Sequence, residues 1–428
     1  MSFGAQPLHA AGRHAHVAPD DVAADAPLRP RTVLLLLVML PLFGQSFHYV
    51  KDLYPLWALS KAFPVLSLPL IFAMIRRPLL PMSRQTLLTF LWLLLAPSIA
   101  GSFYFNQDFF LGLTAEVKIL PMLYFFSFSG LLLLLRPTLR EMACAFLICG
   151  IATILTLVIL WAVIPDSWYS GTYVIGTSPL FSADDRGHRI RMPMYFAMIL
   201  AFYSYRRFLQ TWHFKWLLYA ALVFLLTIGV VKTRSMVVGL VMVFAINGFL
   251  AIPPWGRLVM LVAMPFAGLG LLSISYLGNM LHFDASSGFA LRLETMQKAA
   301  AFLGYSPARW LFGVGTLSPL NTESLFSYFD HFFFLADITW LGILFEFGII
   351  GATLILLYQI RGLMFGLRIR RAGDAPILGA LFDYALYALL ISYLYPLTLT
   401  PGESAVVFAV FAYVWRQRRV TAPTTATA

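Results

Sequence analysis

Long apolar stretches are the feature that most limits how this chain can fold. Runs such as Met142–Ile164, Phe214–Val231 and Trp255–Leu277 are long enough to cross roughly 30 Å of hydrocarbon as helices. Over the whole chain, 60% of residues are hydrophobic and 11% are charged, whereas soluble domains carry about 25% charged residues. The sequence therefore predicts an all-α, polytopic membrane protein, and it disfavours a large soluble helical protein.

The apolar runs divide the chain into about twelve predicted membrane spans. We place them at residues 32–49, 54–75, 86–105, 117–136, 142–164, 192–210, 214–231, 235–252, 257–277, 333–358, 376–396 and 402–416. Residues 1–30 are predicted to be a disordered cytoplasmic tail, residues 31–416 the transmembrane domain, and residues 417–428 a second cytoplasmic tail.

Basic residues follow alternate spans, which assigns a side to every loop. An excess of Lys and Arg marks cytoplasmic loops, so both termini are predicted to be inside. The residues that carry this pattern are Arg76, Arg77, Arg84, Arg136, Arg140, Arg206, Arg207, Lys215, Arg257, Arg361, Arg368, Arg370, Arg371, Arg416, Arg418 and Arg419. Two long loops, at about 165–191 and 278–332, then lie on the outer side.

The second outer loop contains an amphipathic segment, Phe289–Leu303, whose apolar residues recur at helical spacing. A helix of this kind lies at a membrane surface or covers a cavity. Glu294 and Lys298 are four residues apart in the favourable order and predict a structural ion pair. Arg292 has no such local partner, so it is a candidate ligand for an anion, with a lipid headgroup contact as the alternative.

Arg189 and Arg191 precede the sixth predicted span, and Pro193 suits the first turn of that helix. A helix N-terminus favours an anion, and a guanidinium group adds bidentate hydrogen bonds to phosphate oxygens. The alternative is pairing with Asp184 or Asp185 in the same loop. We expect one arginine to fill each role, and spacing alone does not distinguish them.

Lys232 and Arg234 lie at the outer turn between the seventh and eighth predicted spans. A charge beside a membrane helix is costly unless it is paired, hydrated or functional. Lys232 can simply extend its side chain to the headgroups, whereas Arg234, flanked by Thr233 and Ser235, is expected to face the interior.

His331 opens the tenth predicted span and can act as a general base near neutral pH. Asp337 lies six residues later, about 240° around a regular helix, so the two would not share a face. Asp337 would instead orient an arginine inside the membrane, where an unpaired carboxylate is expensive. Asp184, Asp185 and His188 form a solvated loop more readily than a metal site, and nucleotide-binding loops are missing from the sequence.

Four stretches resemble the superfamily of O-antigen ligases and O-antigen or exopolysaccharide polymerases, which are bacterial envelope glycosyltransferases. They are Lys232–Ser235 (KTRS), Arg292 followed by Trp310–Gly315 (WLFGVG), His331 at the start of a span, and Glu346–Gly351 (EFGIIG). Phe332 to Phe334 stand where ligases follow the histidine with Asn or another polar residue. Residues 336–346 look more like certain polysaccharide polymerases.

The resemblance implies a GT-C-like, metal-independent glycosyltransferase that needs no cofactor. It would lie in the bacterial inner membrane with its active site facing the periplasm. The donor would be a glycan on undecaprenyl pyrophosphate, and the acceptor a second glycan or a lipid. Membrane lipids and a chain-length regulator would be further partners, and nucleic acid would not. The resemblance assigns the pyrophosphate to Arg189, Arg191, Lys232, Arg234 and Arg292, and the role of base to His331 or Asp337.

Polymerisation of lipid-linked repeat units is the function that these stretches favour. The alternatives are a ligase that transfers the glycan to lipid A–core, and a transporter of polysaccharide or lipid-linked sugars. A transporter would be expected to have helices broken near the bilayer centre, whereas most ionisable residues of this chain cluster at the predicted outer edge.

Overall fold

The computed structural model describes residues 27–47, 50–51, 53–75, 80–169, 179–184, 187–258, 288–318, 320–321, 325–329, 333–371, 375–394 and 401–421. These residues are almost entirely helical, which confirms the predicted all-α class. The predicted disordered tail at 1–30 lies outside the described residues except for its last four. The predicted C-terminal tail begins inside a helix that continues to Thr421.

The elements follow one another along the chain as helices, with short 3-10 or π turns (η) and one pair of strands. They are α2 (Pro30–Phe43), α3 (Tyr54–Leu66), α4 (Leu68–Ile75), α5 (Ser83–Tyr104), α6 (Phe109–Ala115), η1 (Glu116–Leu123), α7 (Tyr124–Leu135), α8 (Leu139–Val163), η2 (Asp166–Trp168), β1 (Phe181–Asp184), β2 (Gly187–Ile190), α9 (Tyr195–Thr211), α10 (Phe214–Leu226), η3 (Thr227–Val231), α11 (Arg234–Ala251), α14 (Gly288–Leu303), α15 (Pro307–Phe312), α16 (Leu325–Tyr328), η4 (Leu335–Ile338), α17 (Thr339–Arg371), α18 (Pro376–Ile391) and α19 (Pro401–Thr421).

Seven helical segments of the described chain are long and apolar enough to cross a membrane. They are Tyr54–Phe72, Ser83–Tyr104, Phe109–Leu135, Leu139–Val163, Phe214–Val231, Arg234–Ala251 and Leu335–Arg371. Pro30–Phe43 and Pro376–Ile391 are shorter apolar helices at two further predicted positions. The predicted span at 257–277 lies almost wholly outside the described residues, so the total of about twelve remains a prediction.

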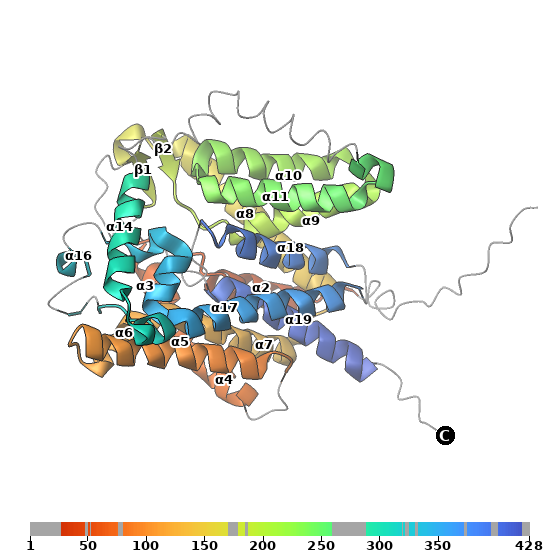
Figure 1. The fold of residues 1–428 in the computed structure, drawn as a ribbon. Helices are drawn as coiled ribbons and strands as arrows, with labels where there is room; N and C mark the ends of the chain where they lie inside the picture. The colour runs from red at the N-terminus through yellow and green to blue at the C-terminus, as the bar shows by residue number, and fades with distance from the viewer. Residues whose placement is uncertain are drawn as a thin grey trace, which may run out of the picture.

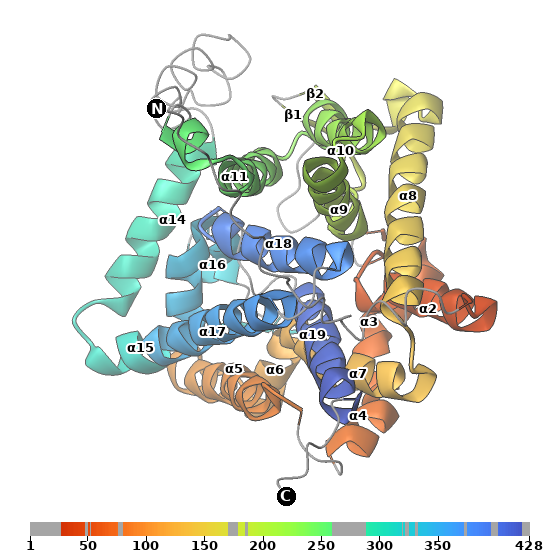
Figure 2. The same ribbon diagram turned by 90° about the vertical axis from the view of Figure 1, so that its right-hand side faces the viewer.

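The helices form a bundle with two distinct ends. Figure 1 shows the β1–β2 hairpin and α14 at one end and the C terminus at the other. Figure 2, which views the bundle from the C-terminal side, places α17, α18 and α19 in the middle, with α9 to α11 on one side and α5 to α7 on the other. The two predicted outer loops therefore contribute their hairpin and amphipathic helix to the same end.

The core is built from aromatic and small side chains of these central helices. Tyr124, Phe128, Phe202, Phe408 and Phe411 are among the largest fully buried side chains. Two helices approach closely where a glycine in one of them leaves room for an aromatic ring of the other. Helix α19 lies between α17 and α7, consistent with the continuous burial of residues 404–414.

Candidate functional site

The outer arginines of the first loop lie on a β-hairpin. Arg189 is part of β2 and pairs with Ser182 of β1 across the antiparallel ladder. The Nε groups of Arg189 and Arg191 both donate to the Ser182 hydroxyl, at 3.0 and 3.1 Å. Arg189 and Ser182 are buried, and Arg191 is half-buried. One hydroxyl therefore holds the two guanidinium groups side by side.

The start of the helix after these arginines differs from the prediction. Helix α9 begins at Tyr195, so Pro193 lies before its first turn; the two arginines precede the helix, as expected, but lie on a strand and its extension. Strand pairing continues past β2, because the Arg191 amide donates to the Leu180 carbonyl at 2.8 Å. The backbone N–H and C=O groups in this ladder are paired with the neighbouring strand, so they are not available for helical hydrogen bonds.

Lys232 joins the hairpin from a second part of the chain. Helix α10 ends in the π turn η3, which contacts β2. Lys232 then adopts a left-handed backbone conformation, with φ +52°, and its amide donates to the Thr227 carbonyl. Its Nζ lies 3.3 Å from the position that a Cβ would occupy on Gly187, in the hairpin turn. The structure thus places the Lys232 ammonium next to the hairpin turn.

Arg234 follows directly and is the first residue of α11. Helices α9 and α11 both begin at the hairpin end of the bundle, as Figure 1 shows. The N-terminal ends of helices carry partial positive charge and free N–H groups. Arg234 is half-buried.

Arg292 lies on α14, which crosses the same end of the bundle (Figure 1). Its guanidinium is 3.9 Å from the Asp337 carboxylate in η4, and each side chain is about half exposed, at 47% and 48%. Asp337 therefore meets an arginine, as the sequence analysis proposed. The expected pair between Glu294 and Lys298 is confirmed, with a distance of 2.7 Å.

Other predicted residues have structural partners or lie outside the described residues. The Arg309 guanidinium lies over the rings of Tyr104 and Phe302 and donates to the Phe302 carbonyl, so it fastens α15 to α5 and α14. His331, Asp185 and Arg186 lie outside the described residues. The proposed role of His331 as the base therefore remains a prediction, and Asp337 is the described candidate.

His188 of the hairpin contacts two side chains of the preceding segment, Asp166 in η2 and Tyr169 directly after it. The His188 Nδ1 lies 3.0 Å from an Asp166 carboxylate oxygen, and its ring stacks on Tyr169 at 4.5 Å between centroids. Partial burial, together with the charge of Asp166, raises the pKa of the Tyr169 hydroxyl above its ordinary value. These contacts connect the hairpin to η2. They do not involve Arg189 or Arg191.

The two glycine-containing motifs of the sequence meet each other inside the bundle. Gly348 interrupts α17 with φ +67° and ψ −180°, which frees backbone carbonyls of the preceding turn. The amides of Val314 and Gly315 donate to the carbonyls of Phe345 and Glu346, at 2.8 and 3.2 Å. The Trp92 indole donates to the third carbonyl, that of Phe347, at 3.4 Å.

Side chains at this crossing would collide. A Cβ on Gly348 would lie 2.2 Å from the Leu311 carbonyl oxygen, and a Cβ on Gly315 would lie 2.2 Å from the Pro97 carbonyl oxygen. Because these positions are glycine, residues 313–315 can lie directly against the backbone of the broken helix α17. Irregular backbone at membrane depth is tolerated where protein groups satisfy its hydrogen bonds, and the broken α17 meets that condition.

Buried charges accompany the break. The Lys118 ammonium donates to both carboxylate oxygens of Glu346, at 2.7 and 2.8 Å, and lies 3.9 Å from Glu116. Glu116 and Lys118 belong to η1, the turn that interrupts the span Phe109–Leu135. From the sequence we identify Glu346 only as the start of the Glu346–Gly351 stretch and do not identify Glu116 or Lys118, although charges inside predicted spans are themselves a signal.

Comparison with known proteins adds no relative. No protein-family model matches the chain, and no curated protein is detectably similar to it. The functional assignment therefore depends on the geometry of the residues. In the part of the chain that the structure describes, no three His, Cys, Asp or Glu side chains are grouped so as to hold a metal ion.

At the end of the bundle away from the hairpin, arginines pair with carboxylates of other helices. Arg206, predicted in a cytoplasmic loop, lies inside α9, where it binds the buried Asp383 carboxylate and donates to Asn247 at 3.0 Å. Arg29 donates to Glu141 at the start of α8 and to the Arg136 carbonyl. These arginines join helices to one another through carboxylates.

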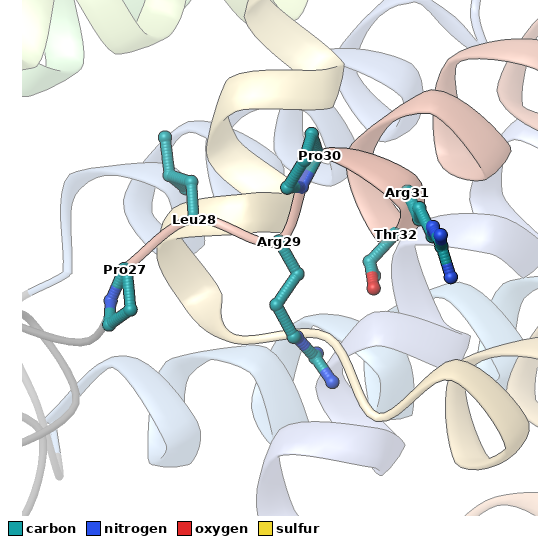
Figure 3. A pocket seen from close by; sticks show the side chains of 6 residues that line it. All are labelled: Pro27, Leu28, Arg29, Pro30, Arg31 and Thr32. Carbon is teal, nitrogen blue, oxygen red and sulfur yellow. The ribbon is translucent and has the colours of Figure 1, made fainter.

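A surface recess beside Arg29 is separate from the hairpin arginines. Figure 3 shows the side chains that line it, which come from the consecutive residues 27–32 at the start of α2. Arg29 is tied to the first turn of α8, while the hairpin follows the other end of that helix. With 25 residues, α8 separates them by roughly 37 Å at about 1.5 Å per residue. The recess is therefore not the candidate substrate site.

Proposed function

We propose that the protein is a membrane glycosyltransferase that polymerises oligosaccharide repeat units carried on undecaprenyl pyrophosphate. The observation that carries this proposal is the hairpin geometry, in which Arg189 and Arg191 share the Ser182 hydroxyl and Lys232 approaches the hairpin turn. Guanidinium groups held side by side match the oxygens of a diphosphate. The proposed location is the bacterial inner membrane, with this end of the bundle facing the periplasm.

The proposed reaction is a single displacement. The acceptor hydroxyl attacks the anomeric carbon of the donor, a glycosidic C–O bond forms, and the bond between that carbon and the pyrophosphate oxygen breaks. The leaving pyrophosphate keeps the bonding electron pair. Arg191, Arg234 and Arg292 would stabilise the charge that develops on it. Asp337 or His331 would accept the acceptor proton, and the configuration at the anomeric carbon would invert.

The amphipathic helix α14 supports this assignment through its position. It crosses the end of the bundle that carries the hairpin (Figure 1), and Arg292 on it lies beside Asp337. A carboxylate next to a diphosphate-binding arginine would be held close to the reacting centre. Positioning of this kind accounts for a large part of enzymatic rate enhancement.

The test is product formation by purified protein supplied with lipid-linked repeat units. Arg234→Ala is expected to abolish chain extension while expression stays normal. Arg361→Ala is the matched control, because Arg361 is an exposed arginine of α17 whose side chain contacts Gln85. Near-normal extension by the Arg234 variant would refute its role. Transfer of glycan to lipid A–core without extension would replace the polymerase with a ligase.

A second candidate, a transporter for lipid-linked sugars, is favoured by one feature of the structure. Discontinuous helices with buried ionisable residues are typical of transporter binding sites, and α17 is broken beside Lys118 and Glu346. Movement of the lipid-linked sugar across vesicles, without any new glycosidic bond, would select the transporter over the transferase.

A further inference from the structure

The positive and negative charges beside the α17 break are not equal in number. Glu116, Lys118 and Glu346 supply two carboxylates and one ammonium. Lys118 is committed to Glu346, whose two oxygens it binds at 2.7 and 2.8 Å. The two Glu116 oxygens are buried and have no hydrogen-bond partner among the described residues, and the nearest ammonium is 3.9 Å away.

Two ionised carboxylates beside a single ammonium group would be unstable at this degree of burial. The Glu116 side chain is 1% exposed, and an isolated ionised carboxylate in such surroundings costs several kcal/mol, on the order of the penalty for any buried unpaired ion. Lys118 can neutralise one carboxylate only. One further positive charge must therefore be present, or one carboxylate must be neutral.

We propose that Glu116 is a proton-binding site within the membrane, and that it holds one proton at neutral pH while Lys118 neutralises Glu346. This inference is independent of the proposed function, because it follows from charge and burial at the break and not from the hairpin arginines. It assigns a bound proton to η1, at the point where the span Phe109–Leu135 is interrupted.

The break itself favours a proton over a metal cation. A cation site would need several oxygen ligands. The carbonyls of Phe345, Glu346 and Phe347 already accept hydrogen bonds from Val314, Gly315 and Trp92. Within the described residues, no group of three metal-binding side chains surrounds Glu116. A proton needs no such ligands, and it neutralises the carboxylate directly.

The charges that act on Glu116 are those of Lys118 and Glu346. Helices α3, α5, α6, α7 and α19 also pack against η1. Their titratable or charged residues are Tyr54, Lys61, Arg84, Tyr104, Tyr124, Glu403, Tyr413, Arg416, Arg418 and Arg419.

Infrared spectroscopy tests the site directly on the full-length protein in lipid nanodiscs. A protonated carboxyl group has a C=O stretching band that an ionised carboxylate lacks. We expect this band in the wild type at neutral pH and its loss in Glu116→Gln. Lys118→Met should roughly double the band, because two carboxylates without an ammonium both need a proton. Glu294→Gln, in the exposed pair on α14, should leave the band unchanged.

Thermal unfolding gives a second, independent measurement. Gln is a neutral isostere of protonated Glu, so Glu116→Gln should unfold close to the wild-type temperature, whereas Lys118→Met should unfold at a lower one. If wild-type protein lacks the protonated band at neutral pH, or if Glu116→Gln retains it, the proposal is overturned. Strong destabilisation by Glu116→Gln would equally contradict it, since that result requires an ionised Glu116.

Discussion

The hairpin end and the α17 break surround their polar groups in opposite ways. At the hairpin, two guanidinium groups meet a neutral serine hydroxyl, and Arg191, Lys232 and Arg234 keep part of their surface open. At the break, backbone amides and an indole donate hydrogen bonds to buried carbonyls, and an ammonium group donates to a carboxylate. The first arrangement suits an anion that arrives from outside, whereas the second holds segments of the protein together.

The difference also separates two uses of arginine in one chain. Arg206 binds the buried Asp383 and belongs to the bundle itself. The outer arginines lie on a hairpin, a helix start and an amphipathic helix that are all at the same end of the bundle (Figure 1). Substitutions in the two regions should therefore affect different measurements, namely stability for the interior and substrate binding for the outer end.

The largest stability effect is expected from Asp383→Ala. This substitution leaves the Arg206 charge buried without its carboxylate, and the loss of one partner from a buried ion pair costs about 3–5 kcal/mol. Thermal unfolding in detergent would measure the loss. The double variant Arg206→Met with Asp383→Leu should recover much of it, because both charges are gone. A double variant no more stable than Asp383→Ala would show that the pair is not the cause.

Gly348→Ala should come next, at about 3 kcal/mol, from a combination of left-handed backbone strain and a collision with the Leu311 carbonyl. Gly304→Ala is the matched control. Gly304 also has a positive φ, of +51°, but a Cβ there would meet only one atom at 3.4 Å. We expect the control to cost about 1 kcal/mol. Equal losses at both sites would mean that the crossing of the two glycine motifs adds nothing.

Ser182→Ala tests the hairpin without removing a charge. It takes away the hydroxyl that positions Arg189 and Arg191, a change worth about 1.5 kcal/mol at the low end for a hydrogen bond to a charged group, or roughly ten-fold in binding. The apparent KM for lipid-linked substrate should rise while kcat and the unfolding temperature stay near wild type. Ser182→Thr should restore KM. A loss confined to stability would make the hydroxyl purely structural.

The smallest effect should come from Lys298→Ala, which breaks an exposed ion pair with Glu294 on α14. Pairs of this kind contribute about 0.3–0.5 kcal/mol. Unfolding in low and high salt would measure the effect, which should shrink at high salt because ions screen exposed charges. A loss above about 1 kcal/mol, the upper limit for an exposed pair, would show that the packing of α14 also depends on the hydrogen bond from Lys298 to the Phe329 carbonyl.

Helices with continuous apolar sequence could be predicted well. The predicted spans 142–164, 214–231 and 235–252 agree closely with Leu139–Val163, Phe214–Val231 and Arg234–Ala251. The amphipathic segment of the second outer loop likewise forms α14, one residue longer than predicted. Burial of a long apolar run inside a membrane leaves few alternatives to a helix, so local sequence was sufficient in these regions.

The hairpin and the α17 break required information that is not local. Residues 181–190 are predicted from the sequence to be a loop, although a short turn between two strands is a recognisable signal. The pairing of the 313–315 segment with Phe345 and Glu346 depends on the fold, because the glycine motifs do not indicate that they contact each other. Lys118 and Glu346 lie far apart in sequence and meet only in three dimensions. A search for charges inside predicted spans would have marked both.

The central claim is that the outer arginines bind a lipid diphosphate, and direct binding tests it most simply. Native mass spectrometry of the full-length protein with undecaprenyl pyrophosphate would compare the wild type, the double variant Arg191→Ala with Arg234→Ala, and the control Arg361→Ala. The wild type and the control are expected to retain the lipid, while the double variant loses it. Equal retention by all three proteins would contradict the account.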